Sequence, residues 1–104
     1  MDIIKNLETL LKKEQDNALI HYSLGNEYLR AKKFAESIKH LHRAVELDPD
    51  YSAAWKLYGR ALTENNRINE AIKAYEKGIA VAGKKGDIQA AKEMRVFLKR
   101  LKKQ

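Results

Sequence analysis

Apolar residues recur along the chain at intervals of three and four, which places them on one side of an α-helix. Leu24, Tyr28 and Ala31 follow this spacing, and Ile38 and Leu41 begin the next run of the same kind. Such runs predict helices at about residues 2–14, 17–31, 34–47, 51–64, 68–82 and 87–103. We therefore expect an all-α fold.

Short polar stretches separate these predicted helices. The sequence Asp48-Pro49-Asp50 ends one of them, because proline lacks the amide hydrogen that a continuing helix needs and disfavours helical geometry in the residue before it. The stretch from Gly83 to Gly86, with two lysines between the glycines, is expected to form the corresponding break after the next pair of helices. The chain is thus divided into pairs of helices joined by turns.

The pairs of helices repeat with a period of 34 residues. Residues identical at this separation are Gly25 and Gly59, Glu36 and Glu70, Ile38 and Ile72, and Lys39 and Lys73. Large apolar and small residues also keep their places, since Leu24 aligns with Tyr58 and Ala44 with Gly78. A fixed period of this length is typical of stacked helical repeats. We expect one domain, 1–104, made of an N-terminal helix (2–14), a first repeat (18–51), a second repeat (52–85) and a C-terminal helix (87–103).

A glycine stands in the middle of the first helix of each repeat. Inside a helix, glycine is destabilising by about 0.5 to 1 kcal/mol relative to alanine. The recurrence of Gly25 and Gly59 therefore needs a gain that offsets this penalty. Close contact between the two helices of a repeat supplies one, because a side chain at either position would hold the helices apart.

These residues resemble the tetratricopeptide repeat, whose pattern is W-x2-L-G-x2-Y, followed by A-x3-F and then P. The first copy reads His21-x2-Leu24-Gly25-x2-Tyr28, Ser37-x3-Leu41 and Pro49. The second copy reads Trp55-x2-Tyr58-Gly59-x2-Leu62 and Ala71-x3-Tyr75. The resemblance covers residues 18–83, with departures at His21, where the family has an aromatic or apolar residue, and at Gly83, where it has proline.

The resemblance implies a short right-handed superhelix of paired helices. A stack of two repeats is expected to be only marginally stable, because about three are usually needed to bury a continuous core. The helices at 2–14 and 87–103 are therefore expected to act as capping helices at the two ends. The last helix has the apolar arc that this role needs, formed by Ala90, Ala91, Met94, Phe97, Leu98 and Leu101.

In this family the first helix of each unit lines a concave groove that receives a peptide or partner protein, so the chain is expected to be a protein–protein interaction module or adaptor. The resemblance implies a groove lined by Tyr22, Asn26, Leu29, Arg30, Lys56, Arg60 and Thr63. Arg30, Lys56 and Arg60 would make this groove basic, so we expect a protein or peptide partner that carries acidic residues or a free carboxylate. Some members hold a terminal carboxylate with a lysine and an asparagine one turn apart. The corresponding pairs, Tyr22 with Asn26 and Lys56 with Arg60, form at most half of that clamp.

The net charge of +7 is concentrated near the C-terminus. From Lys84 onward there are eight basic and two acidic residues, which account for +6 of that charge. The favoured interpretation is that these residues keep a capping helix soluble. The alternative function is electrostatic binding of nucleic acid or an anionic membrane through this helix. Nucleic acid is the weaker choice, because Phe97 lies opposite the basic residues and no base-stacking platform forms.

The sequence offers no candidate for catalysis, a cofactor or a metal, so we expect a protein that is not an enzyme. There is no cysteine, and His40 and His42 are two positions apart on one helix while His21 lies on another. The stretch 83–86 lacks the spacing of a phosphate-binding loop, and no carboxylate has a partner that the sequence places beside it. The cytoplasm is the expected compartment, because cysteine is absent and the N-terminus lacks a continuous apolar stretch.

Overall fold

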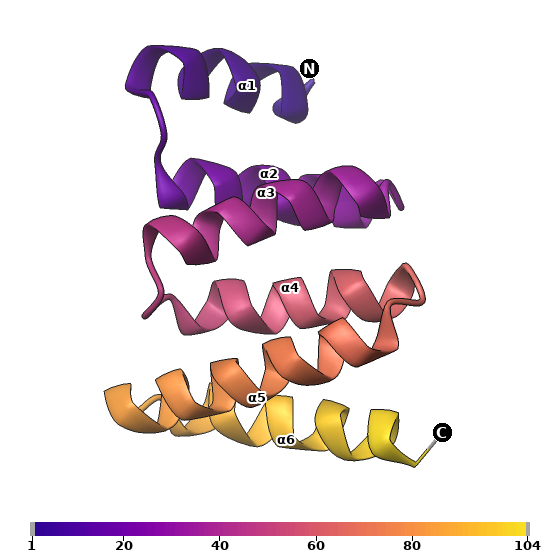
Figure 1. The fold of residues 1–104 in the computed structure, drawn as a ribbon. Helices are drawn as coiled ribbons and strands as arrows, with labels where there is room; N and C mark the ends of the chain where they lie inside the picture. Colours follow the sequence, from indigo (N-terminus) through magenta and orange to yellow (C-terminus); the bar gives the residue numbers. More distant parts are fainter. Residues whose placement is uncertain (1, 104) are drawn as a thin grey trace.

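The computed structural model describes residues 2–103, and within this range the chain is helical and has no β-strand (Figure 1). The prediction of an all-α fold is therefore confirmed. The described helices are α1 (Ile3–Glu14), α2 (Ala18–Arg30), α3 (Phe34–Leu47), α4 (Ser52–Glu64), α5 (Ile68–Lys85) and α6 (Ile88–Lys102). None of these helices has the length and apolar character needed to cross a membrane.

Short polar side chains begin several of the helices. Asn17 Oδ1 accepts a hydrogen bond from the N–H of Ile20 at 3.1 Å, and Asp87 Oδ1 accepts one from the N–H of Ala90 at 3.3 Å. Each bond satisfies a backbone donor that has no partner in the first turn of its helix. α3 ends just before Pro49, as the sequence predicts.

The fifth helix is longer than predicted and corrects the expected break at Gly83. α5 continues through Gly83 to Lys85 and ends at Gly86, whose φ of 75° lies in the left-handed region that glycine adopts without strain. The N–H of Asp87 donates to the carbonyl oxygen of Ala82 at 2.8 Å, which closes the helix. Gly83 is exposed and does not take the positive φ that Gly86 has, so the helical backbone continues through it.

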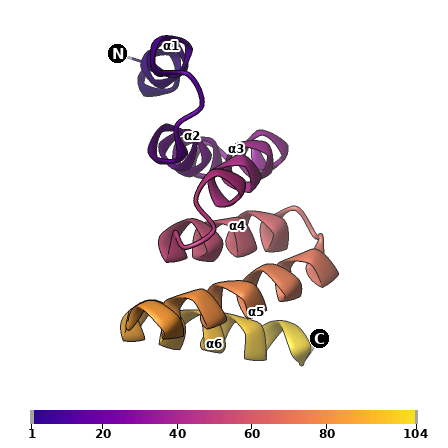
Figure 2. The same cartoon turned by 60° about the vertical axis from the view of Figure 1, so that its left-hand side comes forward.

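Each helix packs against the next along the chain, and the two ends of the chain lie at opposite ends of the stack (Figure 1). In one layer, α4 contacts both α2 and α6. The other layer contains α3 and α5, which do not contact each other in the described chain. Figure 2 shows the first helices nearly end-on and the last ones nearly side-on, so the stack twists along its length. This arrangement is a helical-repeat solenoid.

The two helices of each repeat meet at the glycines, as predicted. A Cβ atom placed on Gly25 would lie 2.4 Å from Leu41 Cγ, and one placed on Gly59 would lie 2.5 Å from Tyr75 Cε1. These separations are far shorter than van der Waals contact. Leu41 and Tyr75 therefore fill the space that a side chain at either glycine would need, and both are buried in the core.

The terminal helices cover the stack to different extents. α1 has no buried residue, contacts α2 alone, and leaves Ile3 53% and Leu10 42% exposed. By contrast, α6 packs on α5 and α4 and buries Ala90, Ala91, Met94 and Leu101. α6 therefore closes the core of the second repeat, whereas α1 is an outer helix held mainly by partly buried contacts.

Candidate peptide-binding groove

The groove predicted from the family pattern runs along α2 and α4, and the structure places its residues in different environments. The half-buried side chains are those of Tyr22, Asn26, Lys56 and Thr63, and the exposed ones are those of Arg30 and Arg60. Leu29 is a correction, because it is only 7% exposed and belongs to the hydrophobic core that also contains Ile38 and Leu41. It supports the groove from below and does not offer its side chain to a ligand.

Lys56 does not present a free charge to the groove. Its Nζ donates to Glu93 Oε1 of α6 at 2.8 Å. This hydrogen bond, together with the charge of Lys56, lowers the pKa of the Glu93 carboxyl below its usual value. The positive charge that the sequence assigned to Lys56 is therefore balanced by Glu93 at the partly exposed surface, and the pair joins α4 to α6.

The α2 part of the groove is also only weakly charged. Arg30 is exposed, and its Nη1 lies 3.7 Å from Glu27 Oε2 one turn earlier on the same helix. The ring of Tyr22 packs against that of Tyr51, with 4.9 Å between the ring centroids. An exposed pair such as Arg30 with Glu27 contributes little to stability. This part of the groove is mainly an aromatic wall.

A cleft of about 420 Å³ opens between α4 and α6, with Tyr75 of α5 beneath it. We call it the α4–α6 cleft; its residues are Arg60, Thr63, Glu64, Tyr75, Phe97, Arg100 and Leu101. The Tyr75 and Phe97 rings pack with centroids 5.7 Å apart and form an apolar floor. Neither Arg60 nor Arg100 forms an ion pair with any described residue, and the same is true of Glu64. The cleft therefore holds two guanidinium groups that remain available, against one carboxylate.

Arg60 and Thr63 were predicted groove residues, whereas Arg100 was not assigned to the site. The sequence places Arg100 among the basic residues of the last helix, which suggested only a solvated surface. The packing of α6 on α4 brings Arg100 to the same cleft as Arg60. Arginine in such a place can form two parallel hydrogen bonds to a carboxylate, so the cleft suits an acidic group.

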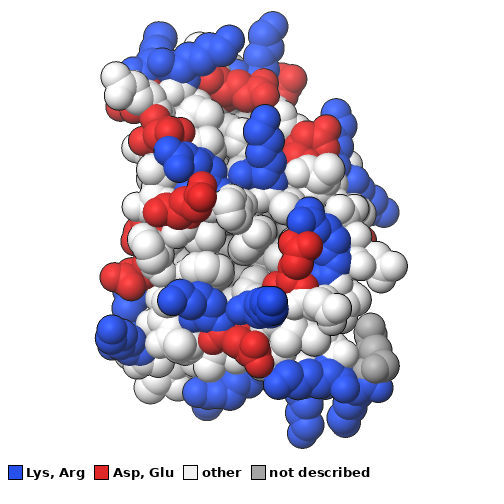
Figure 3. All heavy atoms as spheres, in the orientation of Figure 1, with Lys and Arg blue, Asp and Glu red and all other residues white. Residues whose placement is uncertain are grey.

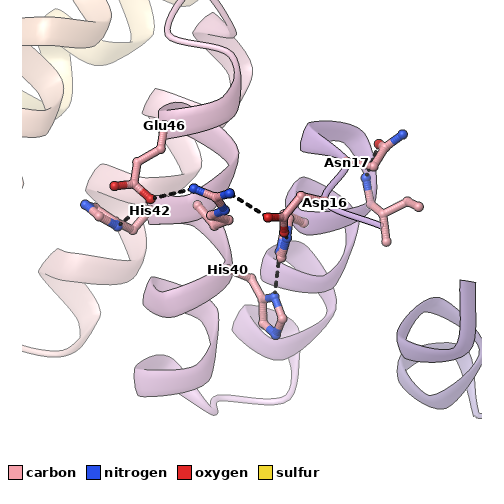
Figure 4. Close-up of polar contacts among 8 residues, drawn as sticks. Asp16, Asn17, His40, His42 and Glu46 are labelled. Carbon is pink, nitrogen blue, oxygen red and sulfur yellow. Dashed lines mark hydrogen bonds and ion pairs between the residues drawn. The ribbon is translucent and has the colours of Figure 1, made fainter. Parts of the chain in front are cut away.

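A polar cluster joins α2 to α3, and the sequence analysis did not predict it (Figure 4). The buried ring of His21 lies between two partners: its Nε2 is 3.0 Å from Asp16 Oδ1, and its Nδ1 is 3.0 Å from His40 Nδ1. Arg43 of α3 also pairs with Asp16. Because two Nδ1 atoms at this distance share one proton, the contact requires at least one neutral imidazole ring.

Lowering the pH from about 7.5 to about 5 is expected to lower the melting temperature of the protein. Burial, then the charges of His21 and Lys39, lower the pKa of His40 from its ordinary 6.5, while Glu8 acts in the opposite direction. The folded protein therefore binds fewer protons than the unfolded chain. The contribution of His40 to stability is complete above pH 6.5 and is lost as the pH falls through the lower folded pKa.

Circular dichroism melts of two variants separate this effect from other titrations. Asp16 does not contribute to the change in stability between pH 7.5 and pH 5, because hydrogen bonds from Arg43 and then His21 hold its pKa at about 2. His40→Gln removes the titrating ring and should flatten the dependence of the melting temperature on pH. His42→Gln, at a side chain that is 54% exposed and lies outside the contact of His21 with His40, is the control variant. Equal slopes for the parent and His40→Gln would exclude His40 as the cause.

These histidines do not extend into a metal site. Within residues 2–103, no group of three histidine, cysteine, aspartate or glutamate side chains is arranged to hold a metal ion. The ring nitrogens of His21 are both engaged by protein groups. The cluster connects α2 with α3, and His21 occupies the position where the family pattern has tryptophan.

Comparisons with known proteins agree with this architecture. A family model described as tetratricopeptide repeat matches residues 22–91. TPR repeat-containing protein PA0015 of Pseudomonas aeruginosa is 46% identical over 99 residues, which are 95% of this chain and 94% of that protein. The solution structure of BPP2914 from Bordetella parapertussis matches with a TM-score of 0.85 at 38% identity, and covers 99% of this chain and 90% of that one.

A more distant structure extends the likeness of fold. The TPR2B domain of yeast Sti1, solved in a complex with pHsp70, matches with a TM-score of 0.90 over 96% of this chain and 80% of that one, at 15% identity. At that identity the likeness concerns the fold alone. The period of 34 residues, the glycine contacts between paired helices and the family match all lead to one assignment. The chain belongs to the tetratricopeptide-repeat family.

Proposed function

We propose that the protein is a non-catalytic interaction module whose α4–α6 cleft binds an acidic segment of a partner protein. The observation that carries this proposal is the pair Arg60 and Arg100, which line one cleft and have no ion-pair partner among the described residues. Guanidinium groups bind carboxylates through paired hydrogen bonds. Phe97 is partly exposed and packs on the buried ring of Tyr75, so it adds an apolar surface on which a neighbouring side chain of the ligand can pack.

The family likeness supports the general part of this proposal. The TPR2B domain of Sti1 shares the fold and was solved in a complex with pHsp70, so a stack with this fold is able to bind another protein. For this chain, the proposal of an acidic ligand rests on its own side chains. Lys56, which the sequence placed beside Arg60 as a ligand-binding cation, is paired with Glu93 of α6 and is therefore less available to a ligand than Arg60.

Charge reversal in the cleft should weaken binding of an acidic peptide by at least about a hundredfold, because two arginine contacts are lost and each hydrogen bond to a charged group is worth about 1.5 to 3 kcal/mol. The variant is Arg60→Glu with Arg100→Glu, and the probe is a peptide of aspartate and glutamate with a free C-terminus. Its dissociation constant is measured by isothermal titration calorimetry. The same peptide with an amidated C-terminus shows whether a terminal carboxylate or the acidic side chains supply the ligand.

A matched control keeps the change of charge but moves it away from the cleft. Lys5 and Lys12 are exposed on α1, which contacts α2 alone, so Lys5→Glu with Lys12→Glu should bind like the parent. Circular dichroism confirms the fold of both double variants. Added salt tests the alternative function, which is electrostatic binding of nucleic acid or an anionic membrane through the basic surface of α6. Such binding should weaken more steeply with salt than binding in the cleft, because it depends on many exposed charges. A folded Arg60 and Arg100 variant that binds as tightly as the parent would exclude this cleft.

A further inference from the structure

A second hollow lies on the face formed by α3 and α5, the two helices that do not contact each other. Figure 3 shows this face, with uncharged surface in the band between the helices and basic side chains along its lower edge. Two adjoining clefts of about 400 and 430 Å³ share His42, Tyr58 and Glu70 and form one elongated surface. We call it the α3–α5 groove. It has no residue in common with the α4–α6 cleft.

Aromatic rings form the floor of the α3–α5 groove. The ring centroids of Trp55 and Tyr58 are 6.2 Å apart, and those of Tyr58 and His42 are 5.9 Å apart. Trp55 Nε1 donates to the carbonyl oxygen of Pro49 at 2.8 Å, which fixes the indole, and the side chain remains partly exposed. The first repeat has fully buried Leu24 where the second has the partly exposed Tyr58, so this aromatic surface is special to the second repeat.

The charges at the edge of the α3–α5 groove are not balanced. Its two carboxylates are already paired: Glu46 with Arg43 at 3.4 Å, and Glu70 with Arg67 at 2.6 Å. The exposed cations without an ion pair among the described residues are those of Lys39, Lys73 and Lys77. The charge that remains available to a ligand is therefore positive.

We propose that the α3–α5 groove is a second binding site, and that it takes an acidic segment of a partner protein carrying an aromatic anchor residue. The anchor would pack on Trp55 and Tyr58, where it excludes water from an apolar surface, and acidic neighbours would pair with the lysines. This inference goes beyond the proposed function. Because the two sites lie on different faces, one molecule has room to hold two partners at once, as an adaptor does.

A nucleic-acid strand shares the two features of negative charge and aromatic stacking, but it fits this groove less well. Glu46 and Glu70 stand at the edge of the groove beside the lysines, where a continuous phosphate backbone would pass close to both carboxylates. A short peptide can place its acidic residues only beside the lysines. Peptide is therefore the favoured occupant, and an oligonucleotide becomes a competing outcome of the test.

The only tryptophan of the chain lies in this groove, so its fluorescence reports on the site directly. The probe is an acidic peptide of roughly twelve residues, long enough for one groove, with a single central phenylalanine. We expect a saturable change in Trp55 emission. Replacing the phenylalanine of the peptide with alanine should weaken binding about tenfold or more, because a buried aromatic anchor carries much of the affinity.

Variants of the groove locate the binding. Lys73→Glu with Lys77→Glu should raise the dissociation constant about tenfold, since two favourable pairs become repulsive. Tyr58→Leu installs the residue that the first repeat has at this position, so it should fold and yet bind the peptide more weakly. The control variant with Lys5→Glu and Lys12→Glu should bind like the parent. The variant with Arg60→Glu and Arg100→Glu is expected to lose binding at the α4–α6 cleft, but its Trp55 emission should still report peptide binding in the α3–α5 groove.

Three results would overturn the proposal. One is no saturable change in Trp55 emission up to about 1 mM peptide. Another is tighter binding of an oligothymidine of similar length in the same assay. The third is a loss of peptide binding in the Arg60 and Arg100 variant without any loss in the Lys73 and Lys77 variant, which would assign the peptide to the α4–α6 cleft and leave the proposed function intact.

Discussion

Deletion of residues 87–104 is expected to leave a chain that aggregates or melts far below the full-length protein. This segment contains α6, whose Met94 is fully buried and whose Leu101 is only 6% exposed. Burying one such side chain contributes roughly 1.5 to 3 kcal/mol. Two of them contribute about 3 to 6 kcal/mol, against a total stability that is usually about 5 to 15 kcal/mol. The deletion would also expose the buried face of α5 to water.

Deletion of residues 1–14 is the matched comparison, since it also removes one terminal helix. α1 has no buried residue, and its removal leaves Asp16 and the N-cap Asn17 in place. The hydrogen bond from the Tyr28 hydroxyl to Glu8 would be lost, but the core would remain closed. We therefore expect a much smaller decrease in melting temperature.

Thermal melts followed by circular dichroism, with light scattering to detect aggregation, distinguish the two deletions. A monomeric chain of 1–86 with an unchanged melting temperature would show that α6 does not stabilise the stack. Its basic surface would then call for a functional explanation. Equal losses from the two deletions would contradict the difference in burial between α1 and α6.

Substitution of Gly59 by alanine is expected to lower the free energy of unfolding by about 1 to 3 kcal/mol, although alanine is the better helix former. The added Cβ would lie 2.5 Å from Tyr75 Cε1 and 2.7 Å from Cζ. The Tyr75 ring is buried at 3% exposure and packs against Phe97, so it has little room to move. Gly59→Leu should lower the free energy of unfolding further than Gly59→Ala, because leucine adds more atoms to the same contact.

Gly83→Ala is the control, because this glycine is also helical but has no neighbour near its Cβ position. It should raise the free energy of unfolding by about 0.4 to 1 kcal/mol through the reduced freedom of the unfolded chain. Urea unfolding measures both variants. The two substitutions should therefore shift the urea concentration at the midpoint of unfolding in opposite directions. A stabilised Gly59→Ala would mean that α4 and α5 do not approach as closely as described.

Much of the fold could be predicted because it depends on local features of the sequence. The period of 34 residues located the repeats, and Pro49 marked the end of α3. Gly83 and Gly86 were harder to separate, since both are glycines in one polar stretch. Only Gly86 takes a positive φ, and that is a property of the folded backbone.

The binding surfaces were less predictable, because they depend on which charges are neutralised. Lys56 and Arg60 looked equivalent in the sequence, one turn apart on the same helix. Glu93, 37 positions away, pairs with Lys56 and not with Arg60. Arg100 reaches the same cleft as Arg60 only because α6 packs against α4.

By itself, the sequence determined that this protein is a stack of paired helices with glycine contacts inside each pair. Helical periodicity and the placement of small residues are short-range properties that the order of residues displays directly. The tertiary structure alone decided that His21 meets His40, that Lys56 is neutralised, and that an aromatic groove opens between α3 and α5. Each of these features joins side chains from different helices, and their separation depends on how the helices pack.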